Sequence, residues 1–272
     1  MMKSEILENL SSRYSKVELK PSETIEIKKS GIYTLTLKSD TKINVFANTD
    51  IILEVELLGQ KNKIELYIDS NSNVGYYAIN RTLDIKTNVF LKENAYLETY
   101  DFFANEKSNT DFKVDLLGYH AMLEYSVGMY AKGSEDHSHK ISVNHLVPST
   151  DSNINKRAVL NDKAKCTFDV ESFIKKSSSK SSAYQKSKII NLSDECISHV
   201  NPILLIDEYD VMAGHGATVS KISKNDLYYL QSRGLTVQDS LKLITFGFLL
   251  EIVPKYMLEK IEKLLEGKMN HE

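Results

Sequence analysis

The chain of 272 residues contains only two cysteines, Cys166 and Cys196. Two cysteines cannot build the disulfide framework of a small secreted domain, and free thiols fit a reducing, cytoplasmic location better. No run of about 18 apolar residues occurs, so we expect no membrane span. The first residues also lack the apolar stretch of a signal peptide. Composition therefore argues against the secreted and membrane-spanning classes.

Arginine is scarce, and neither sign of charge dominates. The chain has 34 Lys+Arg, of which only Arg13, Arg81, Arg157 and Arg233 are arginine, against 37 Asp+Glu, for a net charge of -3. Lysine contacts phosphate as a point charge and lacks the bidentate geometry with which arginine reads bases. We therefore expect neither a nucleic-acid partner nor a membrane partner.

Glycine and proline are also infrequent, at 11 and 4 residues, and neither Asn-Gly nor Asp-Gly occurs. These dipeptides are the strongest short signals for β-hairpins. Between about residues 22 and 222, short stretches such as Ile32–Leu37 and Ile64–Ile68 nevertheless alternate apolar and polar residues. Alternation of period two predicts β-strands. Many strands with Asn, Asp and Ser between them, and without hairpin signals, favour a parallel β-solenoid over a sandwich or barrel.

The pattern changes to a helical period after Ile222. Ser223 and Thr236 are each followed three residues later by Asp, which predicts two helix N-termini. Apolar residues at helical spacing continue beyond Pro254, and Gly267 is expected to end the last helix. The sequence thus predicts a mainly β protein with an N-terminal helical segment (1–21), a β-solenoid core (22–222) and a C-terminal helical domain (223–272).

Cys196 and His199 lie three residues apart, and His215 follows in the next apolar–polar stretch. Thiolate and imidazole are ligands of iron–sulfur clusters and of zinc. One chain offers too few such ligands for a cluster, but a two-fold dimer doubles the set. In the alternative interpretation, Cys196 is a small buried apolar residue and His215 an ordinary strand residue.

Two further groups of side chains are candidates for chemistry. His137 and His139 would share one face of a strand and could chelate a metal, although their polar surroundings favour a solvated loop. Asp207, Glu208 and Asp210 could supply acid–base carboxylates, as in a β-solenoid enzyme that acts on polysaccharide. A solvated strand edge explains these acidic residues equally well, and a non-catalytic structural module remains a third possibility.

Ser220 and Lys221 follow a glycine-containing stretch, but the glycine that precedes the lysine of a Walker A motif is missing. We therefore expect no ATP binding by this chain.

A distinctive series of motifs runs from Pro202 to Gly234 and beyond. It contains Leu-Ile-Asp-Glu-Tyr-Asp-Val at 205–211, His-Gly-Ala-Thr-Val-Ser at 215–220, Leu-Tyr-Tyr-Leu-Gln-Ser-Arg-Gly at 227–234 and Gly-Phe at 247–248. With these motifs the chain resembles the SufB/SufD family of iron–sulfur cluster assembly scaffold proteins. The resemblance covers about residues 85–265.

The resemblance implies a right-handed parallel β-helix with a C-terminal helical domain. It implies a non-enzymatic scaffold that dimerises through its last strands, as a homodimer or with a SufB/SufD-like paralogue. It further implies that the C-terminal helices bind a SufC-type ABC ATPase, which hydrolyses the ATP, and that a cysteine desulfurase or sulfur carrier supplies sulfur.

The resemblance also assigns roles to single residues. His215 matches the interface histidine of SufD-type chains, whereas Cys196, in Cys-x-x-His-x-x-Pro, matches the interface cysteine of SufB-type chains, and His199 matches that motif's histidine. Gly216 stands where SufB-type chains carry Glu. The chain thus combines both types, which implies a single-paralogue homodimer. Cys196 and His215 are then expected to bind iron of a transient [4Fe-4S] or [2Fe-2S] cluster, with His199 as a possible extra ligand.

Overall fold

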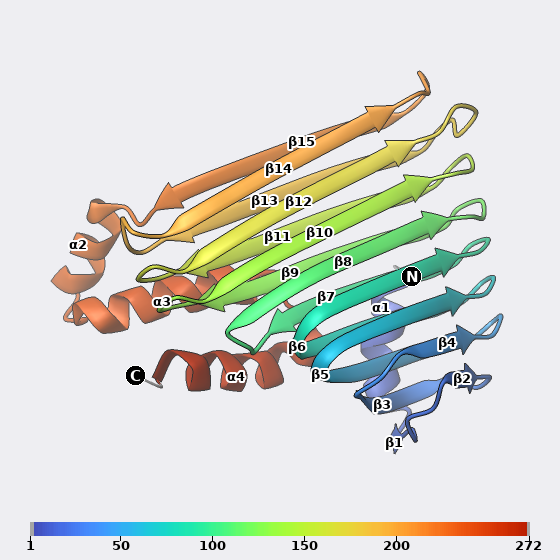
Figure 1. Ribbon diagram of the computed structural model, residues 1–272, viewed down its shortest axis with the longest axis horizontal. Coiled ribbons are helices and arrows are strands. Elements are labelled where there is room, and N and C mark those ends of the chain that lie inside the picture. Colours follow the sequence, from blue (N-terminus) through green and yellow to red (C-terminus); the bar gives the residue numbers. More distant parts are fainter. Residues whose placement is uncertain (1–2, 271–272) are drawn as a thin grey trace.

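Parallel strands wind into one flattened solenoid in the computed structural model, which describes residues 3–270 (Figure 1). The 15-stranded sheet contains, in these residues, parallel strand pairs throughout, for example β10 with β12 and β13 with β15. This architecture confirms the predicted parallel β-helix. The strands are β1 (Lys16–Glu18), β2 (Thr24–Ile27), β3 (Gly31–Leu37), β4 (Thr41–Val45), β5 (Asp50–Ile68), β6 (Asn73–Leu91), β7 (Tyr96–Phe103), β8 (Lys107–Leu116), β9 (Met122–Ala131), β10 (Asp136–His145), β11 (Asp151–Leu160), β12 (Lys165–Ile174), β13 (Ser182–Asn191), β14 (Ile197–Ile206) and β15 (Met212–Lys221).

Helices flank the solenoid in sequence. They are α1 (Lys3–Glu8), the 3-10 helix η1 (Asn9–Ser12), α2 (Lys224–Ser232), α3 (Val237–Leu250), the 3-10 helix η2 (Lys255–Met257) and α4 (Leu258–Asn270). The side chains of Ser223 and Thr236 accept hydrogen bonds from the amides of Asn225 and Asp239, which confirms both predicted helix starts. The predicted end at Gly267 is wrong, because α4 continues to Asn270. Tertiary contacts of Lys268 and Met269 with the solenoid hold this last turn in place.

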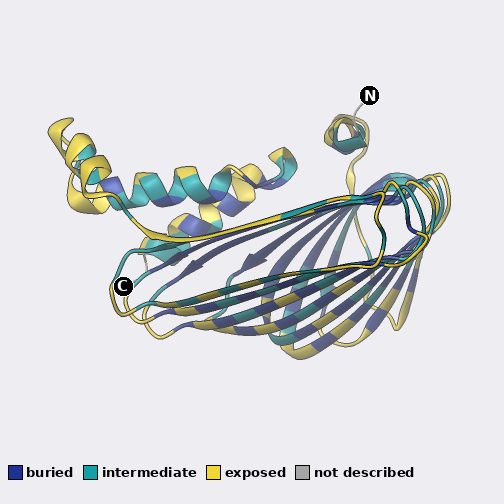
Figure 2. Ribbon diagram, turned by 90° about the horizontal axis from the view of Figure 1, so that it is seen from above, coloured by how far each residue is buried: buried dark blue, intermediate teal, exposed yellow. Residues whose placement is uncertain are grey.

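The two faces of the solenoid take alternate strands. From β6 onward, β8, β10, β12 and β14 form one face, and β7, β9, β11, β13 and β15 form the other. Figure 2 shows the two layers. Buried residues alternate with less buried ones along strands of the uncovered layer such as β8 and β10, whereas β7, beneath the helices, is buried along nearly its whole length. Because successive side chains of a strand point to opposite faces, every second residue enters the interior between the layers. Hydrogen bonds between neighbouring coils join residues 23 apart near the N-terminus and 31 apart near the C-terminus, so the coils lengthen along the chain.

The corners of the solenoid explain why hairpin dipeptides are missing. Asn48, Asn71 and Asn94 occupy equivalent corners with φ of 57–59°. Asparagine tolerates this left-handed conformation because its short amide bonds locally. The backbone N–H of Asn71 donates to Glu93 O at 2.9 Å in the next coil, and the Asn94 amide donates to Asn71 Oδ1 at 3.0 Å. Each turn is therefore stabilised by the next coil.

Helices α1, α3 and α4 of the described chain cover the face that contains β7, β9 and β11, where α1 packs against the first parts of β5 and β6 (Figure 2). Leu7 and Leu10 from the N-terminus and Met257 and Ile261 from the C-terminus share one apolar cluster with Tyr100 of that face. None of the helices described in residues 3–270 is long and apolar enough to cross a membrane. Within residues 3–270, no helix lies on the outer side of the opposite face (Figure 2).

Candidate functional site

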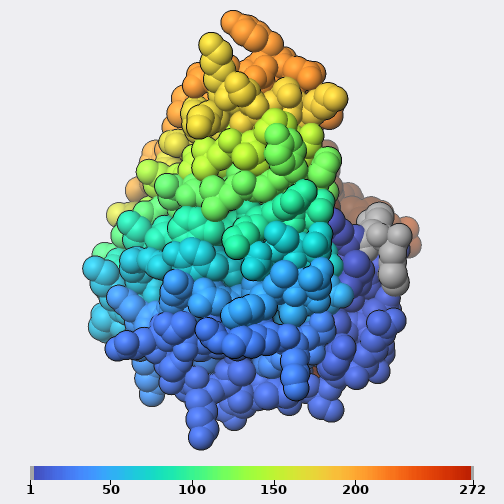
Figure 3. Space-filling view, turned by 90° about the vertical axis from the view of Figure 1, so that its right-hand side faces the viewer, coloured from blue at the N-terminus to red at the C-terminus, as the bar shows by residue number. Residues whose placement is uncertain are grey.

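The last coil, formed by β14 and β15, is an open end of the solenoid. Strand β14 pairs with β12 and β15 pairs with β13, and within residues 3–270 neither has a strand on its other edge. Figure 3 shows the molecule narrowing toward this coil. Large apolar side chains on it are 43–63% exposed: Ile197, Ile203, Leu205, Met212 and Val219. Unpaired edges with exposed apolar side chains are typical of a surface that another chain covers.

Cys196 directly precedes β14 and lies on the interior side of the open end. Its side chain is partly buried and packs, with that of Val200, against the main apolar core. Its thiol donates to the carbonyl oxygen of Asp162 at an Sγ–O distance of 3.5 Å. Burial raises the pKa of this thiol, so at neutral pH the group is protonated in the single chain. Metal binding would therefore have to release a proton from Cys196.

His215 lies on the interior side of the other strand at the open end. In the register of β13 and β15 it is level with Gln185, whose side chain is buried in the interior and bonds to Ser172 Oγ at 2.8 Å. Residues that are level in a parallel pair point the same way, so the His215 side chain continues an interior column. It is exposed because no further coil covers it, and within the described part of the chain it forms no hydrogen bond or ion pair. Its imidazole is free to bind a ligand.

His199 lies on the opposite face of β14. It is level with Thr167, while Cys166 and Phe168 on either side of Thr167 are buried in the interior. The His199 side chain therefore points outward. The structure thus places Cys196 and His215 on the same side of the open end, but it does not bring His199 to them.

Cys196 and His215 do not meet within one chain. Strands β14 and β15 run in opposite directions (Figure 1), with Cys196 just before the start of β14 and His215 near the start of β15. The two side chains consequently lie toward opposite ends of the last coil. Among the described residues, no three His, Cys, Asp or Glu side chains are grouped closely enough to hold a metal ion. A cluster site at the open end would need ligands from a second chain.

The prediction that His137 and His139 lie in a solvated loop is wrong. Both side chains are buried inside the solenoid on β10, where their Nδ1 atoms bond to Ser108 Oγ and Thr110 Oγ1 at 2.7 Å. They form no metal-binding group within the part of the chain that the structure describes. The period-two pattern that continues through Ile141 was the signal for an interior position.

The acidic segment at 207–210 forms a corner between β14 and β15. The Glu208 carboxylate accepts hydrogen bonds from the amides of Ser177 at 2.8 Å and Tyr209 at 2.9 Å. Hydrogen bonds from backbone amides lower the pKa of Glu208, as expected for a carboxylate that caps a turn. This arrangement supports a structural role rather than the acid–base role of a polysaccharide-active enzyme.

Sequence reasoning missed a row of interior polar side chains. Lys156 reaches across the interior from β11 and donates to the carbonyl of His139 at 3.3 Å. Lys156 of β11 and Asp101 of β7 are both level with Val127 of β9, so their side chains enter the interior in one column. Asp101 accepts a hydrogen bond from Tyr125 at 2.7 Å. Burial lowers the pKa of Lys156 to about 7 and raises that of Asp101 to about 6. Cys166, the other cysteine, is also buried, and it packs in the apolar core.

Comparison with known proteins agrees with this architecture. The model of the family described as SUF system FeS cluster assembly, SufBD core domain, matches residues 36–248. The iron–sulfur cluster assembly protein SufD of Bacillus subtilis is 34% identical over 134 residues, which are 49% of this chain and 31% of that protein. An iron–sulfur cluster assembly SufBD family protein of Mycobacterium tuberculosis is 26% identical over 215 residues, which are 76% of this chain and 25% of that protein.

The matched regions make up only about a quarter to a third of the length of these relatives. The match to the core-domain model, in contrast, covers most of the present chain and nearly all of its solenoid. The chain therefore belongs to the SufBD family of iron–sulfur cluster assembly proteins.

Proposed function

We propose that the chain is a scaffold subunit on which a nascent iron–sulfur cluster is built between two chains. The cluster is cargo that is assembled and passed on. The observation that supports this proposal most directly is that Cys196 and His215 lie on the interior side of the same unpaired coil. These two residues supply thiolate and imidazole, which are ligands that iron–sulfur clusters accept.

Two-fold symmetry would bring the two residue types together. A two-fold axis perpendicular to both faces pairs β14 with the same strand of a second copy in antiparallel fashion and does the same for β15. This rotation reverses the strand direction of the second copy. Cys196 of one chain and His215 of the partner subunit then lie toward the same end of the joined coils. An axis along the strands would leave them at opposite ends, so the proposal requires the first arrangement.

The proposed dimer also accounts for the exposed apolar edge. Ile206 on β14 and Val219 on β15 are 41% and 48% exposed, and they would be buried between two copies. Each is level with a buried residue of the preceding coil, Ile174 and Ile189 respectively, and so continues an interior column. Unpaired backbone groups of both edge strands would gain partners in two continuous antiparallel pairs. The proposal is a homodimer, and a SufB/SufD-like paralogue could occupy the same place.

The helical tail is the proposed site for a second partner. Tyr228 and Tyr229 of α2 and Leu243 of α3 are 54–74% exposed. We assign this surface to a SufC-type ABC ATPase, which would supply the ATP hydrolysis that this chain lacks the motif to perform. ATP-driven movement of the tails would open the interface so that iron and sulfide reach the ligands. A cysteine desulfurase or sulfur carrier would provide the sulfur, and the assembly would take place in the cytoplasm.

Anaerobic reconstitution of the whole chain with ferrous iron and sulfide tests the proposal. We expect the wild type to bind iron and sulfide and to absorb visible light, and we expect Cys196→Ser and His215→Ala to lose most of this binding. Cys166→Ala is the matched cysteine control, because that thiol is fully buried one coil before the open end and should not be needed. Full iron content and visible absorbance in Cys196→Ser would contradict the proposal.

His199→Ala tests the assignment of faces. Since this side chain points away from the interior, we expect the variant to retain its cluster. Loss of the cluster in a folded, dimeric His199→Ala protein would place His199 among the ligands instead.

A further inference from the structure

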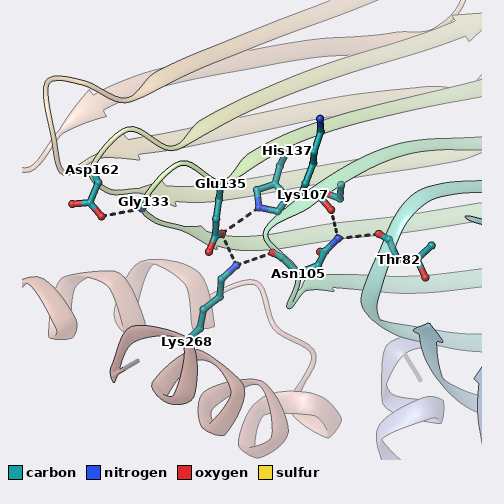
Figure 4. Close-up of polar contacts among 9 residues, drawn as sticks. Thr82, Asn105, Lys107, Gly133, Glu135, His137, Asp162 and Lys268 are labelled. Atoms are coloured by element: carbon teal, nitrogen blue, oxygen red, sulfur yellow. Dashed lines mark hydrogen bonds and ion pairs between the residues drawn. The ribbon is translucent and has the colours of Figure 1, made fainter. Parts of the chain in front are cut away.

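The end of α4 lies against the corner between β9 and β10, where a buried histidine connects to the surface (Figure 4). Lys268 Nζ contacts a carboxylate oxygen of Glu135 at 2.7 Å, and it donates to the carbonyl of Asn105 at 3.3 Å. The same Glu135 oxygen lies 3.3 Å from Nε2 of His137. Lys268 and Glu135 are only 11% and 10% exposed. Three ionisable side chains thus link the end of α4 to the interior of the solenoid.

Both ring nitrogens of His137 are engaged. Nε2 faces the Glu135 carboxylate, which can only accept, and Nδ1 lies 2.7 Å from Ser108 Oγ. A neutral imidazole with its proton on Nε2 fits this arrangement, because Nδ1 then accepts from the serine hydroxyl. The site holds His137 in one neutral tautomer as long as the lysine neutralises Glu135.

The charges around Glu135 set the protonation of this histidine. Burial lowers the pKa of His137, and the Lys268 ammonium lowers it further, whereas Glu135 and Asp136 act in the opposite direction. Burial alone would raise the pKa of Glu135, but hydrogen bonds from His137 and Lys268 hold it below its usual value. Burial also lowers the pKa of Lys268. Lys268 and a protonated His137 therefore compete for one buried carboxylate.

The remaining ionisable groups near this pair come from several elements. Cys166 of β12 is level with His137, and burial raises the pKa of its thiol, so it carries no charge. His139 on the same strand is kept neutral by its own burial. Glu106 and Lys132 from neighbouring corners face Lys268 with opposite effects on its pKa. Glu135 thus provides the carboxylate that Lys268 and His137 contact directly.

We propose that the end of α4 is a latch whose release is linked to proton uptake by His137. Docking of Lys268 disfavours a proton on the imidazole, so by reciprocity a proton on the imidazole must disfavour docking of Lys268. Lowering the pH loosens the end of α4, and pulling α4 away makes the interior histidine more basic. Protons have a route to the site, because Glu135 also lines a surface cavity of about 470 Å³.

The other anchors of the helical tail do not share this property. Glu54 binds Lys260 at 2.9 Å and Tyr256 at 2.6 Å, and, despite its burial, these partners and Lys16 lower its pKa to about 2. Glu251 pairs with Arg157, which also lowers the pKa of the carboxyl. Both carboxylates stay charged between pH 5.5 and 8 because neither titrates there. Neither of these two anchors therefore contributes to a pH response between pH 5.5 and 8.

Hydrogen exchange of the whole chain, corrected for the intrinsic exchange rate at each pH, tests the latch. We expect protection of residues 264–270 to fall about five-fold or more between pH 8 and 5.5, which corresponds to about 1 kcal/mol, while protection of α3 stays constant. His137→Gln keeps a neutral donor toward Glu135 and should abolish the dependence. His145→Gln is the matched control, because this buried histidine bonds to Thr150 and Ser152 rather than to the α4 site. That control should retain the dependence.

A second measurement does not depend on replacing an interior residue. In Lys268→Met, the pKa of His137 measured by NMR should rise by about half a unit or more, since a nearby cation is removed. An unchanged pKa would overturn the proposal. So would an equal pH dependence of α4 protection in wild type and His137→Gln.

Discussion

Arg157 of β11 and Glu251 at the end of α3 are joined by two hydrogen bonds of 2.6 Å each. The arginine side chain is only 2% exposed, and it also donates to the carbonyl of Phe248 at 2.7 Å and stacks on the Phe248 ring. A guanidinium is planar and can satisfy both carboxylate oxygens and the carbonyl at once. This buried arginine thus joins the helical tail directly to the solenoid through a bidentate ion pair.

Arg157→Lys should weaken this ion pair, because an ammonium cannot form the two parallel hydrogen bonds of a guanidinium with the carboxylate. We expect a loss of about 1–2 kcal/mol in the free energy of unfolding, measured by urea denaturation. Arg81→Lys is the matched control, since Arg81 pairs with Glu56 through one bond of 2.9 Å at an exposed site. An equal loss in both variants would show that the Arg157 geometry carries no extra stability.

Much of the solenoid could be predicted from the sequence because two local signals agree along it. Period-two alternation marks the strands, and Asn48, Asn71 and Asn94 mark corners that recur at one position of each coil. The end of α4 could not be predicted, because Gly267 favours termination locally and contacts of Lys268 and Met269 with the solenoid override it.

The candidate site was only partly accessible from sequence. Residue types and the family resemblance selected Cys196, His199 and His215, but the side on which each lies depends on register with residues one coil earlier. That register placed His199 outward. Interior polar residues such as Lys156 were hidden for a related reason: alternation does not reveal that a polar side chain occupies the inward position.

Asp101 should make stability depend on pH. Its carboxyl is buried, and burial raises its pKa to about 6, against about 3.9 in an unfolded chain. An acid whose pKa is higher in the folded chain than in the unfolded chain contributes stability that is fully present below about pH 4 and is lost as the pH rises through about 6. We therefore expect the free energy of unfolding of Asp101→Asn, relative to wild type, to increase by about 2–3 kcal/mol between pH 4 and 7.

Urea denaturation of both proteins across that pH range measures this difference. Comparison of the two proteins removes the effects of other carboxyls, such as Glu54, that titrate in both. A difference that stays constant with pH would mean that Asp101 titrates normally in the folded chain.

Val219→Lys should disrupt the proposed dimer without unfolding the monomer. The side chain is 48% exposed on edge strand β15 and is level with the buried Ile189, so a lysine there is solvated in the single chain but would be buried against a second copy. We expect the dimer dissociation constant to rise at least about ten-fold, measured by analytical ultracentrifugation. Leu117→Lys is a control of similar exposure, at 44%, away from the open end. Equal dissociation in both variants, or none in either, would argue against an interface at the open end.

Lys156→Met tests whether the interior carries a charge at neutral pH. Burial lowers the pKa of Lys156 to about 7, against about 10.4 in an unfolded chain, and Asp101 and Asp169 only partly oppose this effect. A base whose pKa is lower in the folded chain than in the unfolded chain contributes stability that is fully present above about pH 10 and is lost as the pH falls toward about 7. Methionine has a similar volume and does not titrate, so the variant should gain stability relative to wild type as pH falls from 10 to 7. Urea denaturation should show a relative gain of a few kcal/mol over this range, and a flat difference would mean that the ammonium is held charged by the carbonyls of His139 and Asp169 that it contacts.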